Sequence, residues 1–367
     1  MKKMSQGFSL IEMMISVVLG LILMSGVIQM FLSSRAAFSS QQAISRVQET
    51  GRLAVEFLAR DIRMAGFLGC TSKDGTTTST LNSPTTFPND WLTFVMGYHV
   101  TSSASSMPAT SDSGISHTPL NGTDMIVIRG ASISGAVTTA VSTDTTIYSK
   151  VVSTSTAGCG TGSDMLNGLC PNDIAVEANC TKATVFQITG IQNTAGVANI
   201  THVAAGTPGN ATATWGGAPS DTTNAYAAGA EVLKMNRIIY FIATGSSGNP
   251  TLFQNAAVRN TTTGAVTYQD TELLDSVESL HLTYGVDTSA TPDGIPDIYQ
   301  DANSMSAAQW SKVLSVRVEI LVRSADNNVV SEPQKYTFNS ATVSPPAGDL
   351  HLRQVFTTTI GIRSRLP

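Results

Sequence analysis

The sequence predicts an α+β protein in which one long N-terminal helix packs on an antiparallel β-sheet within a large, β-rich and loop-rich globular domain. Two observations support this fold class. Residues 8–34 carry a single charge and are mostly apolar, and residues 35–64 continue without a proline. Beyond residue 70, short runs of apolar residues alternate with stretches rich in Thr, Ser and Gly. A helix and a sheet that are each apolar on one face bury those faces against each other.

The composition favours a folded chain and gives no indication of a nucleic-acid-binding surface. The chain has 367 residues, of which 42% are hydrophobic and 13% charged, so it is large enough to bury a substantial core. Lys and Arg number 21 against 26 acidic residues, for a formal charge of −5. A direct nucleic-acid partner requires clustered basic side chains, which this sequence lacks.

The N-terminus predicts a membrane anchor. Residues 8–34 exceed the roughly 20 apolar residues that span a bilayer as a helix. Lys2 and Lys3 precede this run and favour a cytoplasmic N-terminus, which places the rest of the chain on the far side. An ordinary secretory signal is the alternative, but the apolar run is too long and no small-residue cleavage site ends it.

Residues 35–64 predict a soluble continuation of the same helix. Apolar or small residues recur at steps of three and four and form one face: Ile44, Val47, Gly51, Ala54, Leu58, Ile62 and Ala65. We therefore expect one helix over residues 8–64, about 80 Å long at 1.5 Å per residue. Its first half, residues 8–34, is transmembrane, and its second half packs on the globular domain.

The start of the chain resembles a known signal. Gly7 is followed by Phe8-Ser9-Leu10-Ile11-Glu12 and then by the apolar helix. This pattern resembles the class III signal of type IV pilins and of the pseudopilins of type II secretion, with Ser9 where Thr is frequent. The resemblance implies that the prepilin peptidase removes the leader 1–7 by cleavage between Gly7 and Phe8. It also implies N-methylation of Phe8 and assembly of the helix into a filament core.

Glu12 is a charge inside an apolar run. A carboxylate in hydrocarbon costs at least a few kcal/mol unless it finds a partner, so such a residue is a functional candidate. The pilin resemblance implies that Glu12 pairs with the Phe8 amine of a neighbouring subunit. The alternative is a carboxylate that interacts with the dipole at the start of the helix, worth under about 1 kcal/mol.

The four cysteines all follow the apolar segment: Cys70, Cys159, Cys170 and Cys180. An even number in an oxidising compartment predicts two disulfides, for which three connectivities are open. Buried free thiols are the alternative. Zinc is excluded because the spacing contains no CxxC pair and no nearby histidine.

The globular part divides at residue 230. Residues 65–230 are Thr-, Ser- and Gly-rich with long loops, and residues 231–367 complete an antiparallel sheet. Apolar or alternating runs predict strands at 125–130, 146–152, 173–178, 184–191, 231–243, 277–286, 316–323 and 356–363. Residues 252–258 are expected to form a hairpin with 231–243 across the GSSGNP turn.

Four later motifs make the resemblance to pilins more specific. They are DIRMAGFLGC at 61–70, DGIPDIY at 293–299, SMSAAQW at 304–310 and FTTTIGIRSR at 356–365. They resemble the PilW family of large minor pilins. The resemblance implies a non-enzymatic structural subunit of a pilus-tip complex that primes assembly and so supports twitching motility, adhesion or DNA uptake. It implies an inner-membrane location with a periplasmic globular domain before assembly, and then a place at the pilus tip.

The partners implied by the resemblance are fellow minor pilins of the FimU, PilV and PilX kinds, the major pilin, a tip-associated adhesin, the prepilin peptidase and the inner-membrane assembly platform. Two alternatives remain open. One is a GspJ-like pseudopilin of type II secretion. The other is an adhesin-like or DNA-uptake subunit, for which the acidic charge disfavours direct contact with DNA.

One acidic turn is a candidate cation site: Asp287, Asp293, Asp297 and Asp301. Carboxylates around a glycine turn suit calcium, but the spacing does not match an EF-hand loop, and an ordinary acidic surface turn is the alternative. No other cofactor is expected. The histidines form no catalytic or metal-binding motif, so we expect no enzyme. We expect His281 on the solvent face of its strand and the loop around Trp215 as an exposed contact.

Overall fold

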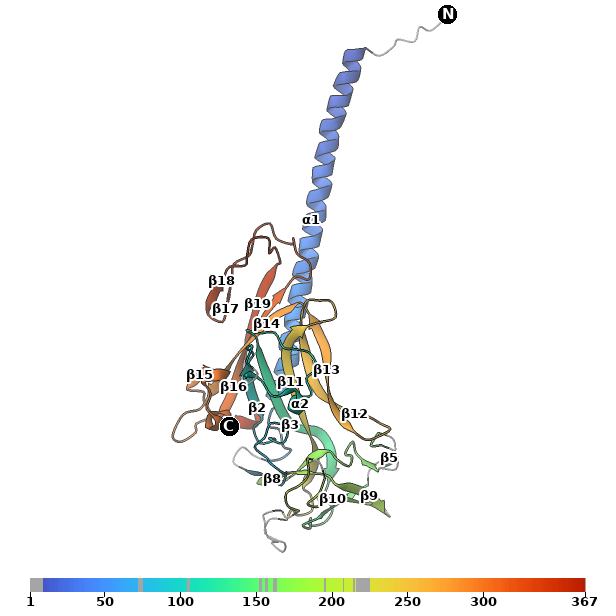
Figure 1. Cartoon of the computed structure of the whole chain (residues 1–367), viewed down its shortest axis with the longest axis vertical. Helices are drawn as coiled ribbons and strands as arrows, with labels where there is room; N and C mark the ends of the chain where they lie inside the picture. The colour runs from blue at the N-terminus through green and yellow to red at the C-terminus, as the bar shows by residue number, and fades with distance from the viewer. Residues whose placement is uncertain are drawn as a thin grey trace, which may run out of the picture.

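A computed structural model shows a long helix that projects from a β-rich head (Figure 1). It describes residues 9–71, 75–103, 106–151, 154–155, 158–160, 164–194, 196–206, 208–213, 215 and 225–366. Helix α1 runs without interruption over Leu10–Arg63. The sequence-based prediction of one continuous helix is therefore confirmed, and so is the α+β fold class.

The second half of α1 packs on the head through its small and apolar face. The buried residues are Val47, Gly51, Ala54, Leu58, Ala59 and Ile62, which follow the predicted periodicity, whereas Ile44 stays exposed. At Gly51 an added Cβ would lie 2.1 Å from the ring of Phe356. Glycine at this position therefore lets the helix approach the sheet closely.

Helix α1 packs on a four-stranded antiparallel sheet with the order β15-β14-β16-β19. These strands are Ile298–Asp301, Val277–Val286, Val313–Arg323 and Arg353–Gly361. Inward-facing residues such as Leu282, Val318 and Ile360 join Leu58 and Ile62 of the helix in one core. The strands predicted from alternation at 277–286, 316–323 and 356–363 are confirmed, with ends that differ by a few residues.

A larger sheet forms the other layer of the head. Its path is β1-β8-β7-β11-β12-β13, with β3 paired to β11 and β2 paired to β3. The strands are β1 Thr76–Ser79, β2 Val95–His99, β3 Asp124–Val137, β7 Ile174–Ala178, β8 Lys182–Gln187, β11 Glu231–Thr244, β12 Pro250–Arg259 and β13 Val266–Asp275. The predicted β11–β12 hairpin is present. Because β3 pairs with β11, the regions before and after residue 230 share this sheet.

A smaller sheet lies at the end of the head away from the helix tip (Figure 1). It has the order β4-β10-β9, formed by Thr146–Lys150, Val197–Thr201 and Gly190–Thr194. Residues 184–191, expected as one strand, divide between β8 and β9 because the chain turns between the two sheets. The remaining short elements are β5 Thr154–Ser155, β6 Met165–Leu166, β17 Tyr336–Phe338, β18 Ala341–Val343, α2 Thr110–Ser113, α3 Ala307–Trp310 and the 3-10 turns η2 Ala302–Ser304 and η3 Arg363–Arg365.

Two disulfides cross-link segments of the head, as the cysteine count predicted. Cys70 pairs with Cys180, which ties the segment after α1 to the turn between β7 and β8. Cys159 pairs with Cys170 and closes a short loop. The structure thus selects one of the three connectivities that the sequence left open.

Candidate functional site

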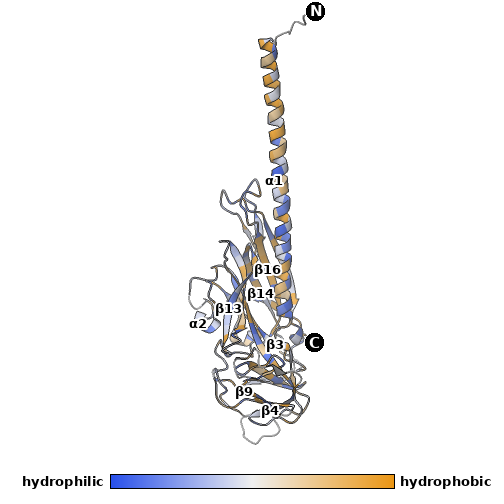
Figure 2. Cartoon of the chain, turned by 90° about the vertical axis from the view of Figure 1, so that its right-hand side faces the viewer, coloured by the Kyte–Doolittle hydropathy of each residue, from blue (hydrophilic) through white to orange (hydrophobic). Residues whose placement is uncertain are grey.

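Among the described residues, none covers the first half of α1. From Leu10, which is 75% exposed, to Phe38, which is 69% exposed, its large apolar side chains face outward. Figure 2 shows this hydrophobic stretch standing clear of the head. The helix is long and apolar enough to cross a membrane. So large an exposed apolar surface needs lipid or other helices around it.

Glu12 lies in the first turn of this exposed helix. Its backbone carbonyl accepts a hydrogen bond from the Ser16 hydroxyl at 2.7 Å, within the helix. Within the described part of the chain, no hydrogen bond or ion pair engages its carboxylate. This charge is therefore available to a partner outside the chain. Gly7 and Phe8, the predicted cleavage and methylation residues, lie outside the described residues.

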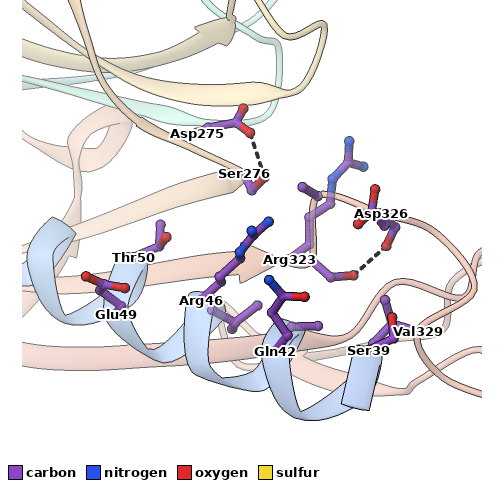
Figure 3. Close-up of a pocket in the computed structure, with 14 residues that line it drawn as sticks. Ser39, Gln42, Arg46, Glu49, Thr50, Asp275, Ser276, Arg323, Asp326 and Val329 are labelled. Carbon is purple, nitrogen blue, oxygen red and sulfur yellow. Dashed lines mark hydrogen bonds between the residues drawn. The ribbon is translucent and has the colours of Figure 1, made fainter. Parts of the chain in front are cut away.

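A small polar hollow of about 230 Å³ marks the place where α1 leaves the head (Figure 3). Arg46 points from the helix toward Asp275 and Ser276, which follow one another at the end of β13. Arg323 at the end of β16 donates to the Asn249 side chain at 3.3 Å. The lining contains both signs of charge and no histidine or cysteine. These groups form a polar contact region between helix α1 and the head.

The four aspartates of the acidic turn do not come together around a common point. Asp287 accepts backbone N–H bonds from Ser289 and Gly294, at 3.0 and 3.1 Å. Asp293 accepts from the Ile295 N–H at 2.8 Å. Among the described residues, no three His, Cys, Asp or Glu side chains are grouped so that they could hold a metal ion. The carboxylates of this turn therefore shape the backbone, and the geometry gives no support to a calcium site built from all four.

Asp297 contributes most to this shaping. Its Oδ2 accepts from the Thr288 N–H at 2.7 Å and from the Thr288 hydroxyl at 2.9 Å. The backbone N–H bond, followed by the hydroxyl bond, lowers the pKa of Asp297 below its ordinary value. Asp301 lies apart, with Oδ1 3.6 Å from Nε2 of His281. The Asp297 carboxylate therefore stays ionised at neutral pH and keeps its bonds to Thr288.

His281 does not face solvent, so that expectation is wrong. Its Nδ1 lies 3.0 Å from Oδ2 of Asp124 in β3, and Nδ1 of His99 in β2 lies 2.6 Å from Oδ1 of the same carboxylate. Burial lowers the pKa of His281, but the hydrogen bond and charge of Asp124 outweigh it and raise the pKa overall. The Asp124 carboxylate also accepts the Leu282 N–H of β14 at 2.7 Å, so it is held beside His281. Alternation along one strand does not reveal such a contact from another sheet.

Trp215 is buried, with 6% of its surface exposed, so its expected role as an exposed contact is also wrong. Its Nε1 donates to the Thr143 carbonyl at 2.9 Å. Its ring lies 4.0 Å from that of His202 and packs edge-on against Phe186 and Tyr226. Trp215, Phe186 and Tyr226 belong to one buried core together with aliphatic residues of the small sheet.

The same region contains the side chain of Glu177 on β7, which is fully buried. The Ser142 hydroxyl donates to its Oε1, and no residue that the structure describes forms a hydrogen bond with Oε2. Burial raises the pKa of Glu177 to about 8, although the Ser142 bond and the charge of Lys182 oppose this rise. The folded chain therefore keeps this carboxyl protonated across a range in which the unfolded chain has released the proton.

This raised pKa predicts a pH-dependent stability. Between about pH 4.5 and about pH 8 the folded state binds one more proton than the unfolded state, so stability falls as the pH rises through this window. Glu177→Gln stays neutral and keeps the shape, so it is expected to stabilise the chain at pH 8 by about 1–3 kcal/mol and to have little effect at pH 4.5. Thermal unfolding across pH 4.5–8.5 measures the difference.

The matched control is Glu332→Gln, because Glu332 is exposed. It is expected to leave the slope of stability against pH unchanged. An unaltered slope in Glu177→Gln would show that Glu177 is ionised in the folded chain.

Two family models match this chain, one in its C-terminal part and one at its N-terminus. The family model of the type IV pilus-assembly protein W matches residues 239–364, which include the entire sheet against which α1 packs. The prokaryotic N-terminal methylation motif matches residues 2–28, which include Gly7, Phe8 and Glu12. No curated protein and no solved structure matches the chain significantly.

Proposed function

We propose that this chain, which is a PilW-like minor pilin of the type IV pilus, works as a non-enzymatic subunit of a tip complex that primes pilus assembly. The observation that carries the proposal is the exposed apolar half of α1, which begins with the methylation motif and continues without a break into the half that packs on a large head. A helix of this kind is anchored in a membrane before assembly and packs among other helices afterwards.

Processing prepares the helix for assembly in this proposal. Cleavage between Gly7 and Phe8 removes Lys2 and Lys3 and creates a new amine on Phe8, which is then methylated. Glu12 follows four residues later, about one helical turn from this amine. In an apolar filament core, the Glu12 carboxylate of one subunit pairs with the Phe8 amine of its neighbour, because either charge alone is costly in hydrocarbon. The pairing sets the stagger between the two helices.

The size of the head favours a place at the tip. Residues 65–367 make up most of the chain, and a head this large would crowd a uniform filament of repeating subunits. The proposed partners are minor pilins of the FimU, PilV and PilX kinds, the major pilin and a tip-associated adhesin. The prepilin peptidase and the inner-membrane assembly platform act on the chain while its head is periplasmic and its N-terminus cytoplasmic. The complex would support twitching motility, adhesion or DNA uptake.

A GspJ-like pseudopilin of type II secretion would share the N-terminal motif. The match of the C-terminal sheet to the pilus-assembly protein W favours the pilus. The experiment is to shear and purify pili and to map the neighbours of this chain by chemical cross-linking. We expect a low-copy subunit at one end, cross-linked to other minor pilins, and few pili when the gene is deleted. Absence from sheared pili, or an abundance equal to that of the major pilin, would contradict a tip role.

A further inference from the structure

A second surface of the head combines apolar and basic side chains. It is a groove of about 820 Å³ between the end of α1 and the C-terminal tail, which lie side by side in Figure 2. The residues that line it are Leu53, Glu56, Phe57, Ala59, Arg60, Arg63, Met64, Gly361, Arg363 and Leu366. Leu366 is 42% exposed, and Leu53, Phe57 and Met64 are partly exposed. We call this surface the tail groove.

The rim of the tail groove carries a net positive charge. Arg60 forms an ion pair with Asp61 at 3.0 Å, so part of its charge is already compensated. Arg63 and Arg363 are exposed, and neither forms an ion pair with any residue that the structure describes. Glu56 is the one acidic residue in the lining. An apolar segment flanked by carboxylates is therefore the chemistry that fits this groove.

The head presents such a segment in the acidic turn. Ile295 is 62% exposed and stands between Asp293 and Asp297. The turn is held in shape because Asp287 accepts the Gly294 N–H and Asp297 accepts the Thr288 N–H. A rigid, exposed apolar side chain between two charges loses little conformational entropy when it binds. We call residues 293–297 the acidic knob.

The acidic knob and the tail groove lie on opposite edges of one sheet. The knob leads into the edge strand β15, and the groove includes Gly361 at the end of the other edge strand, β19. The pairs Val286↔Ile298, Val286↔Val313 and Ser315↔Gly361 place both features at the same end of the strands. They are three strand spacings apart, about 14 Å. One copy can therefore offer its knob while its own groove stays free.

We propose that the acidic knob of one copy of this chain docks in the tail groove of a second copy that stands beside it. Ile295 packs against Phe57 and Leu366, and the flanking carboxylates face Arg63 and Arg363. Because the two surfaces differ, the contact is heterologous and can repeat from copy to copy. The contact area is small, but anchoring of both copies in one membrane raises their effective concentration. This inference goes beyond the proposed tip function, since it concerns pairing of the chain with itself.

The test is disulfide cross-linking between two differently tagged full-length copies in one membrane. One copy carries Ile295→Cys and the other Leu366→Cys, while all four native cysteines are already paired. We expect a covalent dimer from the mixed pair and none from Ile295→Cys alone. Adding Arg363→Glu to the Leu366→Cys copy should lower the dimer yield about tenfold, since an unfavourable charge at a contact costs about 1.4 kcal/mol or more. Asp293→Arg on the other copy should restore it.

Two controls match these variants. Ile133→Cys replaces an apolar residue that is 83% exposed on the other sheet, and its yield with Leu366→Cys sets the background. Arg52→Glu reverses an exposed charge on α1 outside the groove and should leave the yield unchanged. The proposal is wrong if the Ile295→Cys pair gives no more dimer than this background, if Arg363→Glu has no effect, or if Ile295→Cys dimerises with itself.

Discussion

Replacement of Glu12 by valine is expected to lower incorporation of the chain into filaments at least about tenfold while leaving its amount in the membrane unchanged. The carboxylate has no partner within the described chain and lies in the half of α1 that is exposed on all sides. In the proposed filament, its removal would leave the Phe8 amine of a neighbour unpaired in hydrocarbon, at a cost of a few kcal/mol. Each 1.4 kcal/mol of this cost is a factor of ten in occupancy. Quantitative immunoblots of sheared pili and of membranes measure the two pools.

Two further variants test whether the loss of incorporation is due to the Glu12 carboxylate itself. Glu12→Asp keeps the carboxylate and should retain part of the incorporation. Ser16→Ala lies one turn away and removes only a hydroxyl that bonds within the helix, so it should behave as the unaltered chain does. Equal incorporation of Glu12→Val and Ser16→Ala, with the N-terminus processed in both, would remove the pairing role from Glu12.

Loss of the Cys70–Cys180 disulfide is expected to destabilise the head by about 4–5 kcal/mol, against about 3 kcal/mol for Cys159–Cys170. The first bridge closes a separation of 110 residues and the second a separation of 11, and a longer loop loses more entropy in the unfolded state when it is closed. The first bridge also joins the segment after α1 to the β7–β8 turn.

Double alanine variants of each pair, unfolded in urea without reductant, provide the comparison. Alanine is used at both bridges because Cys159 and Cys170 are buried, where a polar replacement would add a cost of its own. A larger loss of stability for Cys159→Ala/Cys170→Ala than for Cys70→Ala/Cys180→Ala would contradict the order predicted from loop length.

The periodicity of the sequence predicted the elements whose two faces differ in polarity. Helix α1 and strands β14, β16 and β19 each have an apolar face that packs in one core, and each was predicted. Strand β13 was missed because all of its residues are exposed or partly exposed, so no apolar alternation marks it. His281 was misplaced because its partner, Asp124, comes from a strand of the other sheet, and periodicity along β14 carries no information about that contact.

The features of the candidate site also differ in whether the sequence alone could predict them. The pattern from Gly7 to Glu12 is local, so the sequence alone indicates it. The tail groove is not local, since it joins residues 53–64 to residues 361–366 through the return of the tail beside α1. The disulfide connectivity likewise depends on which loops meet in the folded head. The aspartates of the acidic turn looked like cation ligands in the sequence because their bonds to backbone N–H groups become visible only in the fold.

Mass spectrometry of the N-terminal peptide of this chain in sheared pili tests the central claim most directly. The account predicts a peptide that begins at Phe8 with a methylated amine, and a precursor beginning at Met1 that is confined to the membrane. A chain that keeps residues 1–7 in purified pili, or that never enters pili when the peptidase is active, would contradict it.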